Sequence, residues 1–202
     1  MKVWASEWIR AMGAVILLGI LLCAIYPLAV WGIGQWLFAD RANGSLLQQG
    51  ERTVGSTLIA QPFAAPAYFH PRPSAIGYSC SRANSGGSNL GPLSKALSEQ
   101  VARRLASYRA ENGLPGAYMV PGDALSASAS GLDPHISPAD ALAQADRVAR
   151  ARGLNRERVR RWIRRHREGR QLGIFGEPRI NVLRLNLALD AMDRTRTDIA
   201  HE

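Results

Sequence analysis

The sequence predicts an α+β protein: a single N-terminal transmembrane helix followed by one mixed α/β extramembrane domain. Two observations carry this prediction. Residues 11–39 contain no charged side chain over 29 consecutive positions, which is long enough for a membrane span. The roughly 160 residues that follow show both helical and strand-like apolar spacing, and their number suits one compact domain rather than two.

The uncharged segment is expected to be the membrane anchor. As a helix it would extend about 43 Å, which exceeds the roughly 30 Å thickness of a hydrocarbon core. Trp31, Trp36 and Phe38 lie near one end, where aromatic rings favour the headgroup level. Pro27 is tolerated in such a helix and can kink it. A cleaved signal peptide is excluded by length, since its apolar part spans roughly 7–15 residues.

The chain is therefore expected to have five parts. They are an N-terminal stub (1–10), a transmembrane helix (11–39), a linker (40–53), a soluble α+β domain (54–190) and a flexible C-terminal tail (191–202). Lys2 and Arg10 precede the apolar segment, and Arg41 and Arg52 follow it. Because only charges near a span orient it, a short basic stub favours a cytoplasmic N-terminus and an extracytoplasmic domain.

Periodicity and turn signals predict the elements of the domain. Four prolines exclude regular helix from residues 61–74, although the aromatic residues there indicate an ordered loop. Helices are expected to begin at Pro92, at Ser137-Pro138 and at Asn155. Residues 176–178 should form a turn. Strands are expected over residues 54–60, 118–120 and 183–189, the last because four leucines alternate with other residues.

Residues 85–92 form an unusual loop of small residues before a predicted helix. Such a loop can present several backbone N–H groups to an anion. The Gly-Lys-Ser/Thr ending of a P-loop is absent. A tight turn that needs backbone freedom explains the same glycines, so both interpretations stay open.

The basic excess of the chain is confined to one segment. The formal net charge is +9. Residues 147–170 hold 11 arginines against two glutamates, so the rest of the domain is electrically balanced. A basic surface is expected at Arg160, Arg161, Arg164 and Arg165. It suits lipid headgroups or an acidic partner, and no nucleic-acid partner is expected for a domain outside the cytoplasm.

Catalytic and metal sites are not expected. Asp133 and His135 could be combined with Ser88, Ser128 or Ser130 into a hydrolase site. No Gly-x-Ser-x-Gly elbow is present, however, and the two residues are too close in sequence to form an obvious triad. An Asp before a proline more commonly stabilises a turn. The four histidines show no ligand spacing and the sequence contains no cysteine pair of a metal site.

Several motifs occur in one order along the chain. They read GSTLIAQ at residues 55–61, YF at 68–69, RPSA at 72–75, SGGSNLGP at 85–92, SGLDPHISP at 130–138, RVA at 147–149 and GEPRINV at 176–182. With these motifs the chain resembles the C subunit of the Kdp-type potassium-transporting P-type ATPase, the KdpC family, over nearly its whole length. Ala60, Asn112-Gly113 and Ala129 depart from the family pattern, which affects local turns and not membership.

The resemblance implies an accessory, non-catalytic subunit of an ATP-driven high-affinity potassium uptake complex in the bacterial inner membrane. The implied partners are a channel-like potassium-translocating subunit, a P-type ATPase catalytic subunit, a small membrane subunit and the lipid bilayer. The family places the soluble domain outside the cytoplasm, against the channel-like subunit. The Asp-Lys-Thr-Gly phosphorylation motif is absent, which agrees with an accessory role. No firmly bound cofactor is expected, and ATP would act through the complex.

Two mechanisms compete for the domain. In the favoured one, it stabilises assembly and caps or gates the potassium entrance; in the other, it is a nucleotide-binding helper that raises the ATP affinity of the ATPase subunit. A signal-anchored extracytoplasmic hydrolase is the alternative of another class. The candidate contacts with a partner or ligand are Ser85, Gly86, Gly87, Ser88, Asn89, Asp133, His135, Glu177 and Asn181.

Overall fold

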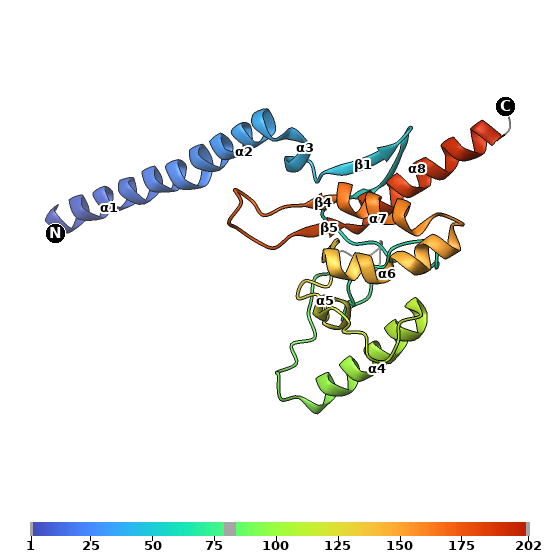
Figure 1. The fold of residues 1–202 in the computed structure, drawn as a ribbon. Coiled ribbons are helices and arrows are strands. Elements are labelled where there is room, and N and C mark those ends of the chain that lie inside the picture. Colours follow the sequence, from blue (N-terminus) through green and yellow to red (C-terminus); the bar gives the residue numbers. More distant parts are fainter. Residues whose placement is uncertain (1, 79–83, 201–202) are drawn as a thin grey trace. The chain divides into compact units, whose positions relative to one another are not determined.

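The computed structural model describes residues 2–78 and 84–200 and divides into two compact units, Met1–Leu46 and Leu47–Glu202 (Figure 1). The first is an N-terminal helical unit, and the second is a mixed unit of helices and short strands. This arrangement confirms the predicted fold class.

The first unit is one long helical segment in three parts. They are α1 (Lys2–Ile20), the π-helical turn η1 (Leu21–Ile25) and α2 (Tyr26–Leu37), with the short α3 (Ala39–Ala42) after them. The most apolar 18-residue window within Val3–Leu37 has a mean hydropathy of 2.5, and none of that window is buried. The segment is thus long and apolar enough to cross a membrane once. The helix already begins at Lys2, so residues 2–10 of the predicted stub are part of it.

The π-helical turn has a physical cause in Pro27. This proline has no N–H to donate, and its ring would press on the carbonyl group of Cys23, four residues earlier. Widening the preceding turn by one residue relieves that conflict without ending the helix. The helix thus accommodates Pro27 through a local change in helical pitch.

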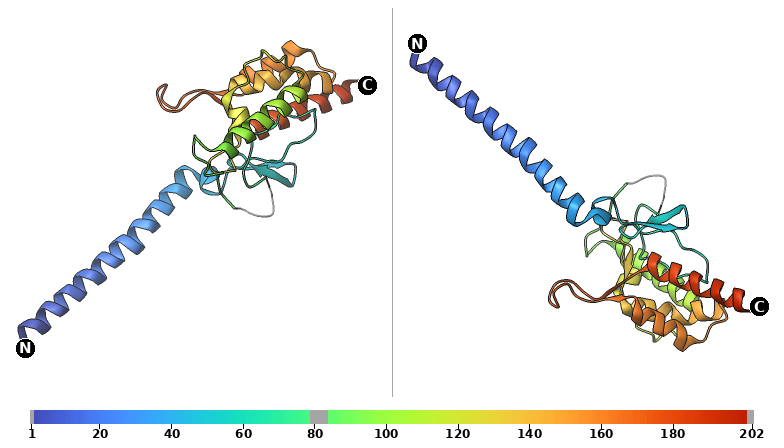
Figure 2. Two further views of the ribbon diagram at one scale, coloured as in Figure 1. Left: turned by 90° about the horizontal axis from the view of Figure 1, so that it is seen from below. Right: turned by 90° about the horizontal axis from the view of Figure 1, so that it is seen from above.

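Two small sheets lie in the second unit. One pairs β1 (Leu46–Gln49) with β2 (Arg52–Ser56), and the other has the order β3-β5-β4. In the latter, β3 (His135–Ile136) and β4 (Arg167–Glu168) both run antiparallel to β5 (Arg179–Asn181). The chain between β4 and β5 is a hairpin that projects from the rest of the unit (Figure 2).

Helices α6 (Pro138–Ala151) and α7 (Arg156–Arg165) were correctly predicted, together with their caps. The side chain of Ser137 accepts the N–H of Asp140, and that of Asn155 accepts the N–H of Glu157. Their apolar faces contribute to the core with parts of β3, β5 and residues 61–74, which we call the proline-rich loop. The core residues are Phe69, Ile136, Ala141, Ala145, Val148, Ala149, Val159, Ile163, Ile180, Val182, Leu185 and Leu189.

The predicted strand over residues 183–189 is wrong, because this segment belongs to helix α8 (Val182–Ala200). Val182, Leu185, Asn186 and Leu189 are buried there, which is the spacing of one helix face. Residues 183–189 contain leucine, alanine and arginine, which favour helix, and no β-branched residue. The four leucines at 183, 185, 187 and 189 therefore alternate by coincidence and do not mark a strand. The helix also continues into the predicted tail.

Other boundaries shift by a few residues. Helix α4 (Lys95–Asn112) begins three residues after Pro92, and Ser94 is its N-cap. Residues 118–120, predicted as a strand, are irregular chain between a turn at residues 116–117 and the short helix α5 (Gly122–Leu125). The segment predicted as a linker contains α3 and β1. The hairpin reverses at Leu172 and Gly173, ahead of the predicted turn.

Candidate functional site

Three of the predicted site residues, Asp133, His135 and Glu177, line one hollow of about 350 Å³, which we call the Asp133 hollow. The loop after Gly131, strand β3 and the end of the hairpin bring them together. Its full lining is Arg72, Asp123, Asp133, His135, Ile136, Ser137, Glu177, Pro178 and Arg179.

Asp133 is the polar centre of this hollow. One carboxylate oxygen accepts a hydrogen bond from Arg72 Nη1 at 2.8 Å, and the other accepts the backbone N–H of His135 at 3.0 Å. His135 Nδ1 lies 3.5 Å from Asp133 Oδ1, and Nε2 lies 3.8 Å from Glu168 Oε2. The imidazole is thus held between two carboxylates.

These contacts suit a fixed anion better than a catalyst. Partial burial raises the pKa of Asp133, but hydrogen bonds from His135 and Arg72 outweigh it and lower the pKa to about 2. A carboxylate of that pKa stays ionised and is a poor general base near neutral pH. Among the described residues, the ion-pair partners of His135 are the carboxylates of Asp133 and Glu168, and no serine side chain forms a hydrogen bond with its ring. The hydrolase interpretation therefore gains no support from this geometry.

Asn181 does not contribute its side chain to the hollow, although it pairs with His135 in the sheet. Its Nδ2 donates to the carbonyl oxygen of Thr57 at 2.7 Å, and its Oδ1 accepts the N–H of Arg184 at 3.1 Å. The side chain is 3% exposed. Asn181 thus joins β5 to the loop after β2 and to the first turn of α8.

The glycine-rich loop packs against residues 128–131 and not into the Asp133 hollow. Gly86 N and Ser85 Oγ both donate to the carbonyl oxygen of Ser130, at 2.9 and 3.0 Å. A Cβ on Gly87 would lie 2.8 Å from the carbonyl oxygen of Ala129. Ser88 is half-buried, and Asn89 is exposed with a positive φ of 51°. A Cβ at Gly87 would thus meet the backbone of residue 129, so close backbone approach accounts for this glycine.

The predicted basic surface lies on α7. Arg161, Arg164 and Arg165 are exposed, whereas Arg160 is half-buried and pairs with Glu157 at 3.2 Å. The guanidinium of Arg165 lies 5.8 Å from the centre of the Trp162 ring. A second hollow of about 350 Å³ is lined by Arg158, Arg161, Trp162 and Arg165.

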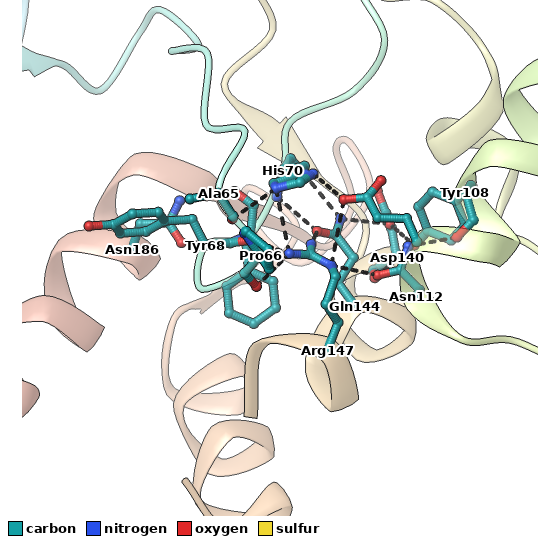
Figure 3. Close-up of polar contacts among 12 residues, drawn as sticks. Ala65, Pro66, Tyr68, His70, Tyr108, Asn112, Asp140, Gln144, Arg147 and Asn186 are labelled. Carbon is teal, nitrogen blue, oxygen red and sulfur yellow. Dashed lines mark hydrogen bonds and ion pairs between the residues drawn. The ribbon is translucent and has the colours of Figure 1, made fainter. Parts of the chain in front are cut away.

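The most extensive polar cluster was missed by the sequence analysis (Figure 3). Arg147 of α6 lies at its centre. Its Nε donates to Asn112 Oδ1 at 3.0 Å, and its Nη2 donates to Gln144 Oε1 at 2.9 Å. Its Nη1 donates to the carbonyl oxygens of Pro66 and Tyr68, at 2.7 and 2.9 Å. One buried guanidinium thus joins α4, α6 and the proline-rich loop.

Further bonds extend this cluster, which we call the Arg147 network. Gln144 Oε1 accepts the N–H of His70, whose Nδ1 lies 2.7 Å from Glu111 Oε1. Gln144 Nε2 and Tyr108 Oη both donate to Asp140 Oδ1. A cavity of about 210 Å³ borders these groups. Because the polar groups of the network are bonded to one another, it is a structural clamp.

A signal for this network was present in the sequence. Asp140, Gln144 and Arg147 follow at spacings of four and three, which places them on one face of a helix. The surrounding alanines and valine of α6 are buried, so this polar row lies inside the molecule. The sequence analysis counted Arg147 among the arginines of the basic segment and so overlooked this buried polar row. In the structure, the side chain of Arg147 is only 6% exposed.

We expect the buried Asp140 to make the stability of the second unit depend on pH. Burial raises its pKa to about 6, although hydrogen bonds from Tyr108 and Gln144 oppose the shift. The folded state therefore binds this proton more tightly than the unfolded state, and stability falls as pH rises from about 4 to about 6. The change should be on the order of 2 kcal/mol.

The variant Asp140→Asn isolates this effect. The amide oxygen can still accept from Tyr108 and Gln144, so the variant should lack the decline over this pH range and should exceed the parent in stability at neutral pH. Denaturant unfolding of the full chain in detergent, followed by circular dichroism, measures it. The same decline in the variant as in the parent would show that another group causes it. The lowered pKa of Asp133 acts in the opposite direction and at lower pH.

Comparison with known proteins gives one consistent result. A family model described as K+-transporting ATPase, c chain, matches residues 8–191. A potassium-transporting ATPase KdpC subunit of Koribacter versatilis is 48% identical over 85% of this chain and 87% of its own. Subunits of the same name from Rhodospirillum rubrum and Cereibacter sphaeroides are 54% and 50% identical. They align over 82% and 90% of this chain and over 85% and 95% of their own.

Proposed function

This chain belongs to the KdpC family of K+-transporting ATPase subunits, and we propose that it stabilises assembly of the complex and caps or gates the potassium entrance of a channel-like subunit. Family membership makes it a non-catalytic subunit of the Kdp ATPase complex. The specific partners in this proposal are the channel-like subunit, the P-type ATPase subunit and a small membrane subunit.

One observation carries the assembly role. The 35-residue helix Val3–Leu37 is apolar throughout its centre, and none of its most apolar window is buried within this chain. Such a helix can meet lipid or the membrane helices of other subunits along its whole length. In the folded unit attached to it, the buried polar groups of the Arg147 network are committed to structural bonds, which suits a scaffold rather than a catalyst.

We place the second unit outside the cytoplasm, in keeping with the short basic N-terminal segment. The Asp133 hollow is our candidate contact with the channel-like subunit, because three carboxylates (Asp123, Asp133 and Glu177) line it against two arginines (Arg72 and Arg179). Carboxylates beside an ion entrance attract potassium, whereas the arginines of α7 would repel it. The α7 surface therefore faces away from the entrance.

Co-purification tests the assembly role. We expect the full chain, tagged and extracted in mild detergent from potassium-starved cells, to purify with the other subunits in fixed stoichiometry. A chain in which an unrelated membrane helix of equal length replaces Val3–Leu37 should retain at least about tenfold less of them, equivalent to a loss of about 1.4 kcal/mol. Equal recovery by both chains would show that the native helix has no part in assembly.

A further inference from the structure

Three large apolar side chains gather at the tip of the hairpin between β4 and β5. Leu172 is 89% exposed, Ile174 is 73% exposed and Phe175 is 62% exposed. Ile174 lies in the turn and Phe175 is the bridge residue that closes it, and both side chains are in contact with solvent. We call residues 172–175 the apolar tip. A cluster of this kind marks an interaction site more than scattered exposed residues do.

The hairpin holds this tip away from the body of the second unit (Figure 2). Gln171 and Phe175 exchange two backbone hydrogen bonds of 2.9 Å, which close the turn. Leu172 has a φ of 53° and Gly173 a φ of 76°. Tight hairpin turns with positive φ favour Gly, Asn or Asp, so a leucine at the first position is unfavourable locally. The apolar side chain is present despite the preference of the turn.

Charged groups begin directly below the tip. Arg170 Nη2 contacts both carboxylate oxygens of Glu177, at 2.8 and 2.9 Å, across the hairpin. Glu168 pairs with Arg179 at 3.0 Å in the adjoining strands. The hairpin therefore changes from apolar to charged within a few residues, as do segments that lie at a membrane interface.

Helix α7, which leads into β4, adds uncompensated positive charge. Arg158, Arg161, Arg164 and Arg165 are exposed, and within the described part of the chain none has a recorded carboxylate partner. Arg158, Arg161 and Arg165 surround the hollow beside Trp162. Guanidinium groups around a hollow suit a phosphate, and tryptophan is favoured at the membrane interface.

We propose that the apolar tip inserts into an anionic lipid bilayer while the arginines of α7 bind the phosphate groups of its lipids. Residues 38–47 connect the membrane helix to the second unit, and ten residues reach at most about 35 Å. The second unit is thus tethered to the bilayer at high effective concentration. A projecting turn whose three large apolar side chains are all mainly exposed is better surrounded by lipid than covered by a flat protein surface. This inference does not depend on the proposed capping role.

Depth measurement by spin labelling tests the proposal. Leu172→Cys is labelled in the full chain after Cys23→Ala and Cys80→Ser, and the protein is placed in nanodiscs of phosphatidylglycerol and phosphatidylcholine. Collision rates with oxygen and with a water-soluble nickel complex then give the depth of the label. We expect a label about 5–10 Å below the headgroup boundary. Met119→Cys is the matched control, because Met119 is 90% exposed outside the hairpin, and its label should stay in water.

Two further samples identify the interaction. Replacing Arg158, Arg161, Arg164 and Arg165 by glutamine should return the tip label to water, and so should nanodiscs of phosphatidylcholine alone. Insertion that persists without those arginines would overturn the proposed role of the charges. A Leu172 label as accessible to the nickel complex as the Met119 label would overturn insertion itself. Protection that appears only when the other subunits are added would replace the bilayer with a protein partner. Circular dichroism of each variant verifies that it is folded.

Discussion

Replacing Arg147 by methionine is expected to lower the free energy of unfolding of the second unit by about 3–5 kcal/mol. Methionine has a similar length and no hydrogen-bond donor. The carbonyl oxygens of Pro66 and Tyr68 and the side-chain oxygens of Asn112 and Gln144 would each lose a bond inside the protein. A buried acceptor left unsatisfied keeps its full desolvation penalty, so several losses together should exceed the effect of an ordinary surface substitution.

Denaturant unfolding of the full chain in detergent measures this difference. The matched control is Arg158→Met, since Arg158 is exposed on the neighbouring helix without a recorded carboxylate partner among the described residues. It should change stability by no more than about 0.5 kcal/mol. Hydrogen exchange should also show that residues 66–70 lose protection in Arg147→Met and keep it in the control. Equal stability of the two variants would refute the clamp assigned to the Arg147 network.

The variant Gly131→Ala should destabilise the second unit by about 2–5 kcal/mol through two effects. Gly131 has a φ of +70°, which strains any residue with a Cβ. The added carbon would also lie 2.7 Å from the carbonyl oxygen of Gly86 and 2.6 Å from Ile76 Cγ1. A backbone atom cannot move aside as a flexible side chain can. The glycine-rich loop must therefore separate from residues 128–131.

Unfolding and hydrogen exchange of residues 84–91 report this separation. Gly122→Ala is the control, because no atom lies within 4 Å of its added carbon, and the change should be neutral or stabilise by up to about 1 kcal/mol. The Gly86 amide, which donates to Ser130, should exchange faster in Gly131→Ala only. Unchanged exchange there would mean that the loop does not depend on this close packing.

Local signals predicted the parts of the fold that depend on neighbouring residues. The caps at Ser137 and Asn155 determine where α6 and α7 begin, and the uncharged segment determines the membrane helix. The leucines at 183, 185, 187 and 189 misled the analysis because their alternation was read without weighing helix propensity. The burial of Leu185 and Leu189 depends on contacts with distant elements, which a period alone does not identify.

The candidate site was predicted in part for the same reason. Asp133 and His135 are close in sequence, and Glu177 joins them because β3 pairs with β5. Asn181 is adjacent in that sheet, but its amide is committed to Thr57, which lies 124 residues earlier. The Arg147 network depends on contacts between α4, α6 and the proline-rich loop. Its polar row on α6 could be read from the sequence, but whether the row faced water or the interior could not.

Steady-state ATP hydrolysis by the purified complex tests the proposed function most directly, with potassium and ATP varied separately. The variant is His135→Ala in the Asp133 hollow, and the control is His166→Ala at the end of α7, which lies outside that hollow. A cap or gate at the ion entrance predicts that His135→Ala changes the potassium concentration for half-maximal activity several-fold and leaves the KM for ATP unchanged. A change in the KM for ATP with an unchanged potassium dependence would contradict it and would support the nucleotide-binding helper instead.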